Sequence, residues 1–165
     1  KADAAHEGLA RQFADHSIDR AYLSIVAGRA IPPAGTVTGA IARSNANRKK
    51  MALVEDGRGK HAVTHYKVLE QFDDAALVEC RLETGRTHQV RVHMASIGHP
   101  LIGDPAYGRT PPRIRPILAA HNFRRQALHA TELGFIHPVS GERIRLSSKP
   151  PADFRTILVE FSGNR

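Results

Sequence analysis

The sequence of 165 residues contains one cysteine and no tryptophan. A single cysteine excludes an internal disulfide. In ALVECRL, Cys80 alternates with Val78 and Leu82, which is typical of a small buried hydrophobic side chain. A reactive thiol is the less favoured alternative. Such cysteine usage is typical of a reducing compartment, so we expect a cytoplasmic protein.

Long apolar runs are also missing. No run approaches the roughly 20 residues that a membrane span requires, and no signal-peptide pattern opens the sequence. We therefore expect no membrane partner. Three Tyr and six Phe are few aromatic side chains, which disfavours a stacking platform for long single strands of nucleic acid. The length suits one domain over residues 1–165.

Acidic residues are outnumbered, 16 against 24 Lys and Arg, which gives a net charge of +8. This balance favours a polyanionic partner, and a generically basic protein is the alternative. Four cations and no acid occupy RSNANRKK at 43–50, where we expect Arg43, Arg48, Lys49 and Lys50 to contact RNA. Because basic residues are spread along the chain, we expect binding through the phosphate backbone of a folded nucleic acid.

The ten histidines do not form a metal-binding pattern. His61 and His65 lie on a predicted strand, where their spacing separates them by about 13 Å. His88 and His93 lie on a predicted helix and point about 140° apart. Neither pair has the spacing of a zinc site, and no nucleophile-elbow motif is present. We expect no metal and no cofactor.

Short β-rich runs separated by turns outnumber the helical patterns. We predict helices over 2–14 and 151–161, and strands at 21–28, 36–42, 62–72, 76–84, 127–136 and 143–147, with a cationic hairpin at 43–50. Consecutive strands joined by short turns favour an α+β fold with a mixed, largely antiparallel sheet and flanking helices over a doubly wound fold.

The stretch TGRTHQVRVH at 84–93 concentrates positive charge at the start of a further predicted helix, 88–97, for which Thr87 is the expected N-cap. Arg86 beside the positive end of the helix dipole favours a bound anion such as phosphate. Arg91 lies beside the buried face of this helix and requires a carboxylate or phosphate partner. A structural ion pair is an equally good explanation.

The segment RLETGRTHQVRVHMASIGHPLIGDPAYG at 81–108 closely resembles the signature of the RluA-type family of RNA pseudouridine synthases. Three further stretches resemble the family in the same order: DRAYLSIVAG at 19–28, RKKMALVEDGRGKHAVTHYKVLE at 48–70 and LHATELGFIHPVSGERIRLSSKPPADF at 128–154. The resemblance covers nearly the whole chain.

The resemblance implies isomerisation of uridine to pseudouridine in structured ribosomal or transfer RNA, on a base flipped out of its helix. It implies catalytic roles for Arg91, which would pair with a catalytic Asp, and for Tyr22, which would stack on the target base. Arg86 is the second choice for the arginine that pairs with the Asp, and a candidate phosphate contact. We also expect His88 and Gln89 to contact RNA. Leu146 matches a family position that packs near the active site, although an ordinary core leucine is an equally good description.

One family motif is missing. The catalytic Asp of the family lies in an HRLD-type motif, and this sequence has none; Asp104 of GDPAYG belongs to another motif, which we interpret as structural. We therefore expect the later part of a catalytic domain, inactive by itself, with a non-catalytic RNA-binding module as the alternative. If strands of the same sheet precede Lys1, a second copy or a partner would cover the exposed edge.

Overall fold

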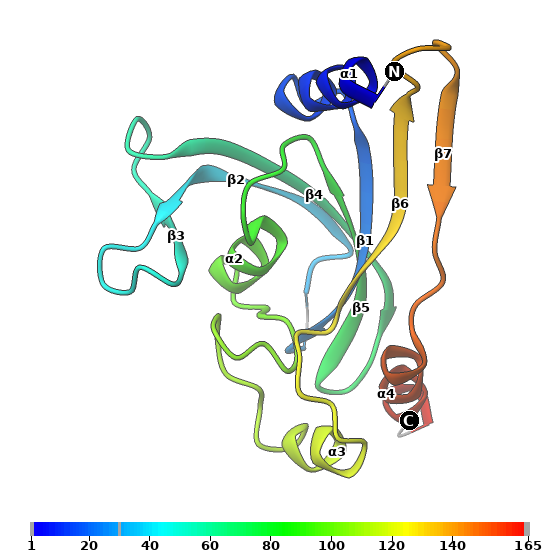
Figure 1. Ribbon diagram of the computed structural model, residues 1–165. Helices are drawn as coiled ribbons and strands as arrows, with labels where there is room; N and C mark the ends of the chain where they lie inside the picture. The colour runs from blue at the N-terminus through cyan, green and yellow to red at the C-terminus, as the bar shows by residue number, and fades with distance from the viewer. Residues whose placement is uncertain (1, 30, 164–165) are drawn as a thin grey trace.

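The computed structural model describes residues 2–29 and 31–163 and contains one seven-stranded sheet with the order β3-β2-β4-β5-β1-β6-β7 (Figure 1). All six strand pairings are antiparallel. The strands are β1 Asp19–Ala27, β2 Ala34–Arg43, β3 Met51–Val54, β4 Lys60–Gln71, β5 Ala75–Leu82, β6 Leu128–Ile136 and β7 Arg143–Ser147. The helices are α1 Ala2–Ala14, α2 Gln89–Ser96, α3 Arg115–Ala120 and α4 Ala152–Gly163.

The α+β class and every predicted strand are confirmed. The cationic stretch joins β2 to β3 as a hairpin in which Arg43 pairs with Met51. Helix α3 is the element that the sequence patterns did not indicate. It is one and a half turns long, too short for apolar periodicity to be visible, and it begins in a segment rich in Pro and Arg.

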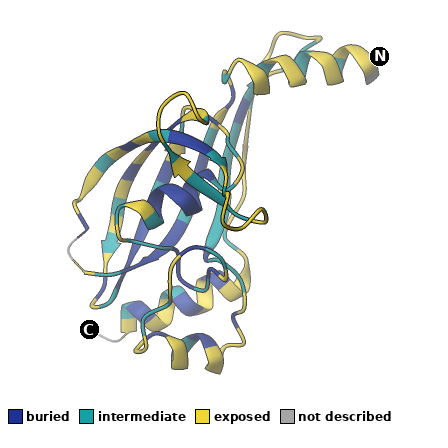
Figure 2. Ribbon diagram, turned by 90° about the vertical axis from the view of Figure 1, so that its left-hand side faces the viewer, coloured by how far each residue is buried: buried dark blue, intermediate teal, exposed yellow. Residues whose placement is uncertain are grey.

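The two faces of the sheet pack against different helices. Along β1, Ile25 belongs to a core cluster with Phe154 and Ile157 of α4, whereas Val26 belongs to one with Met94 of α2. Alternation along a strand places neighbouring side chains on opposite faces. Figure 2 shows α2 with its buried residues against the sheet, while α1 projects at one end with mostly exposed positions.

Helix α2 begins differently from the prediction. His88, not Thr87, is the N-cap residue, and no side chain caps the helix. His88 adopts a left-handed backbone conformation with φ 58°, which is uncommon for residues other than glycine. The predicted C-terminus is confirmed, since Gly98 follows the C-cap residue with φ 84°.

A β-bulge lies next to Tyr22 on β1. Ala21 pairs with Glu132 and Tyr22 with Ala130, so Thr131 is the extra residue on β6. The hydroxyl of Thr131 donates a hydrogen bond of 3.1 Å to the Ala21 carbonyl and fixes the irregularity. Bulges redirect side chains, and this one lies where β1 presents Tyr22.

Within the described residues, no helix has the length and apolar character needed to cross a membrane. The same part of the chain contains no group of three His, Cys, Asp or Glu side chains arranged to hold a metal ion.

Candidate active site

Tyr22 and Arg91 line the same pocket, which has a volume of about 250 Å³. Tyr22 reaches it from the sheet, and Arg91 from the first turn of α2. Arg86, His88 and Gln89 lie on the same wall, and Leu82, Val90, Gln126 and Leu128 complete the lining. The structure therefore brings together five of the predicted site residues, and none of the lining residues is an acid.

Arg91 is held by Asp104 through a two-point ion pair. Its Nε donates to Oδ2 and its Nη2 donates to Oδ1, both at 2.8 Å. The side chain of Arg91 is 10% exposed and that of Asp104 is fully buried. The guanidinium also stacks over the ring of Tyr107, 4.8 Å from its centroid. Within this chain the carboxylate partner of Arg91 is therefore Asp104, in a structural ion pair, and its pairing with a catalytic Asp from outside the sequence stays a prediction.

The charges of this pair are stabilised mutually. Burial raises the pKa of Asp104, but hydrogen bonds from Arg91 and from the backbone N–H groups of Ala106 and Tyr107 outweigh it, so the pKa lies below its usual value. The hydrogen bond to Asp104 raises the pKa of Arg91. Asp104 is ionised, saturated with donors and inaccessible, and is therefore unsuited to act as a nucleophile or base. Arg91 Nη1 makes no hydrogen bond within the described residues, so its N–H groups are free for a ligand.

His88 is neutral and oriented by Tyr107. Its Nδ1 lies 2.8 Å from the Tyr107 hydroxyl, which itself accepts a hydrogen bond of 2.7 Å from the Met51 N–H. Which of the two groups donates depends on the tautomer of His88. Partial burial and the charge of Arg91 lower the pKa of His88. His88 lines the pocket as a neutral group, and its RNA contact stays a prediction.

Gln89 points into the protein, which corrects the expected RNA contact. It is 2% exposed, and its Oε1 accepts hydrogen bonds from the Thr84 hydroxyl and the Arg86 N–H at 2.7 and 3.0 Å. Its Nε2 donates to Val63 O and Thr64 Oγ1. Gln89 is therefore a positioning residue that ties α2 to β4.

His93 extends the same network from the next turn of α2. Its Nδ1 lies 2.9 Å from Thr64 Oγ1, the side chain is fully buried, and Nε2 has no partner. Burial lowers the pKa of His93 to about 4. Helix α2, which carries Arg91, is therefore held against β4 by the hydrogen bonds of Gln89 and His93.

Among residues 2–29 and 31–163, no acidic side chain pairs with Arg86. Its Nε donates to the His61 carbonyl at 2.9 Å, and its Nη2 donates to His16 Nε2 at 3.1 Å. Neither partner is a carboxylate, so no counter-charge from these residues offsets the guanidinium. This agrees with the anion expected at Arg86.

Leu146 does not line the Tyr22–Arg91 pocket. It lies on the edge strand β7, 53% exposed, and lines a neighbouring hollow of about 380 Å³ together with Tyr22 and Arg20. Tyr22 therefore separates two hollows, and the predicted packing role of Leu146 applies to the second. No pattern in the sequence indicates which of the two hollows Leu146 lines.

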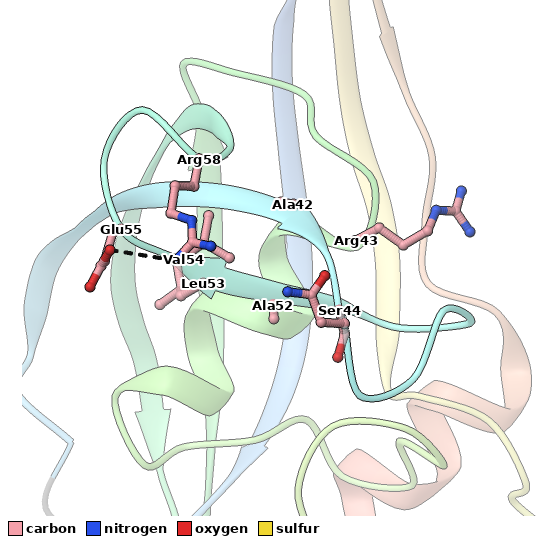
Figure 3. Close-up of a pocket in the computed structure, with 9 residues that line it drawn as sticks. Ala42, Arg43, Ser44, Ala52, Leu53, Val54, Glu55 and Arg58 are labelled. Atoms are coloured by element: carbon pink, nitrogen blue, oxygen red, sulfur yellow. Dashed lines mark ion pairs between the residues drawn. The ribbon is translucent and has the colours of Figure 1, made fainter.

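The basic hairpin lies apart from this pocket. Of its cations, Lys50 donates to the Ala106 carbonyl at 2.6 Å, while Arg48 and Lys49 are exposed. A depression of about 860 Å³ lies at the hairpin, and two of its lining residues, Glu55 and Arg58, form an ion pair of 3.7 Å. Figure 3 shows Arg43 extending away from these two residues.

Sequence reasoning missed Tyr107 and Gln126. Tyr107 lies three residues after Asp104 in GDPAYG, and no pattern in this turn indicates that its hydroxyl contacts His88. Gln126 precedes β6 in a loop without periodicity. Cys80 is buried as predicted, and its burial raises its pKa to about 12.

Comparison with known proteins agrees with these features. The family described as RNA pseudouridylate synthase matches residues 1–96. Ribosomal large subunit pseudouridine synthase D of Zymomonas mobilis is 55% identical over 158 residues, which cover 96% of this chain and 50% of that protein. An uncharacterized RNA pseudouridine synthase of Bacillus subtilis is 44% identical over 164 residues, 99% of this chain and 51% of that protein.

Solved structures show the same fold. Human RNA pseudouridylate synthase domain containing 1 has a TM-score of 0.72 and 30% identity, covering 90% of this chain and 61% of that one. The chain spans about half the length of the curated relatives it matches. From its sequence match and its fold, the chain belongs to the RNA pseudouridylate synthase family.

Proposed function

We propose that this chain binds RNA and positions the target base in a pseudouridine synthase that acts on ribosomal RNA. The reaction breaks the bond between uracil N1 and ribose C1′, forms a bond between C5 and C1′, releases the C5 proton and protonates N1. It is an isomerisation, and atoms and electrons balance without a cofactor. The name of the Zymomonas mobilis relative, at 55% identity, supports ribosomal RNA as the substrate.

The observation that carries this proposal is the shared pocket of Tyr22 and Arg91. Its volume of about 250 Å³ lies below the 300–1,000 Å³ typical of drug-sized ligands, so it suits a single nucleobase. Tyr22 contributes a ring that can stack on a base, and Arg91 contributes a guanidinium group to the lining. Asp104 keeps the guanidinium in place without itself reaching the pocket.

We further propose that the chain forms no pseudouridine by itself. Every residue that lines the pocket is apolar, neutral or basic, and the sequence has no HRLD-type motif. An acid able to attack or deprotonate the ribose must come from a segment outside this sequence. The same observation favours the second candidate, an RNA-binding module that never catalyses a reaction.

A pair of measurements separates the two candidates. The 165-residue chain is tested for binding to a ribosomal RNA fragment, and a longer protein with an HRLD-type segment before residue 1 is tested for tritium release from RNA labelled at uracil C5. We expect binding by both proteins and release by the longer one alone. Binding without release by the longer protein would favour the RNA-binding module, and absence of binding would contradict both.

A further inference from the structure

A second pocket, of about 350 Å³, lies where β2, the start of β4 and the segment before α2 meet. Three cations line it, Arg43, Lys60 and Arg86, and Thr87 adds a hydroxyl. Ile41 and Met51 form part of its apolar wall. No acid belongs to the lining.

Strand register places two of the cations on one face of the sheet. Lys60 is the cross-strand partner of Ile41, so their side chains lie on the same face. Arg43 is two residues beyond Ile41 on β2 and shares that face by alternation. Ile41 packs with Val92 of α2, so this is the face that α2 covers. The third cation, Arg86, is joined to the same corner by its hydrogen bond to the His61 carbonyl.

The three charges are uncompensated. Arg43 donates to the Arg48 carbonyl, Arg86 donates to the His61 carbonyl and to His16 Nε2, and within the described residues the Lys60 side chain makes no hydrogen bond or ion pair. Other cations of the chain, such as Arg81 and Arg125, do have carboxylate partners. Converging like charges repel one another, and an anion in the pocket removes the repulsion.

The pocket neighbours the candidate active site. Arg86 lines both this pocket and the one that holds Tyr22 and Arg91. At its other end Arg43 also lines the depressions at the hairpin. An anion here therefore lies between the target base and the basic hairpin, which is the course that a nucleic-acid backbone would follow.

We propose that Arg43, Lys60 and Arg86 bind a backbone phosphate of the RNA next to the nucleotide that occupies the Tyr22–Arg91 pocket. The proposal rests on the proposed function. Guanidinium groups, an ammonium group and a hydroxyl together satisfy several oxygens of one phosphate. Each such contact contributes to binding without reading the sequence.

The test is the salt dependence of binding of a short RNA hairpin by the 165-residue chain. Lys60→Gln and Arg43→Gln each remove one charge from the pocket. Lys67→Gln is the matched control, because Lys67 is exposed on the same strand and alternation places it on the opposite face. We expect the slope of log K against log salt to fall by about 0.7 to 0.9 in each pocket variant and to stay unchanged in the control.

Unfolding in urea confirms that each variant is folded. If the wild-type slope persists in both pocket variants, the phosphate pocket is disproved while the proposed function stands. A fall of equal size in Lys67→Gln also overturns the pocket, because binding is then diffuse. Failure of the wild-type chain to bind RNA contradicts the proposed function and the pocket together.

Discussion

The guanidinium of Arg91 and the carboxylate of Asp104 form a buried two-point ion pair, with both N–O distances 2.8 Å. Arg91 lies on α2 and Asp104 in the loop that follows it. The pair fixes the loop to the helix and leaves the Nη1 edge of Arg91 unused. The contribution of the pair to stability and the proposed role of Arg91 in catalysis can be measured separately.

Removing one partner should destabilise the protein strongly. Asp104→Ala leaves the guanidinium buried without a counter-charge, and we expect a loss of about 3–5 kcal/mol in the free energy of unfolding. Urea denaturation measures it. Arg29→Gln is the control, since the Arg29–Asp74 pair is exposed and contributes about 0–1 kcal/mol. Additive losses in the Arg91→Ala and Asp104→Ala double variant would show that the two side chains do not interact.

Stability should depend on pH through His93. Its pKa is about 4 in the folded protein, against the usual value of 6.5, so the unfolded chain binds more protons between these values. The stability from His93 is therefore full above pH 6.5 and is lost as the pH falls towards 4, by roughly 3 kcal/mol. We expect His93→Asn to flatten this part of the stability curve. His6→Gln, at an exposed position of α1, should leave the curve as in the wild type.

Cys80 should be unreactive while the protein is folded. The thiol is fully buried and its pKa is raised to about 12, so the thiolate fraction at neutral pH is negligible. Labelling with a thiol reagent should follow the rate of unfolding and become fast in urea. Rapid labelling under native conditions would contradict the burial of Cys80 in β5.

Gly85 and Arg20 should be coupled. A Cβ at Gly85 would lie 1.7 Å from Arg20 Nη1, so Gly85→Ala must displace that guanidinium. Because the contact is with the far end of a flexible side chain, we expect a small loss, about 0.5–1 kcal/mol. The loss should largely vanish in the Arg20→Ala background, as a double-mutant cycle measures. If Gly85→Ala lowers stability equally in the Arg20→Ala variant, the loss arises from the backbone at Gly85 and not from the Arg20 side chain.

Sequence patterns predicted the strands well because turns such as Asp73-Asp74 and alternation mark their limits. They identified Tyr22, Arg86 and Arg91 through resemblance, but not their partners. Asp104 lies 13 residues beyond Arg91, and only the packed fold brings the two together. Gln89 was expected to face RNA because it is a polar residue in a cationic motif. Its side-chain amide instead forms buried hydrogen bonds with Thr84 and Thr64.

The decisive measurement is tritium release by the longer protein with an HRLD-type segment, compared between the wild type and Arg91→Lys. Lysine keeps the charge but loses the planar fork of the guanidinium. With RNA binding and folding unchanged, we predict that Arg91→Lys lowers the rate by about a hundredfold or more. A rate equal to the wild-type rate would contradict the assignment of Arg91 to the active site.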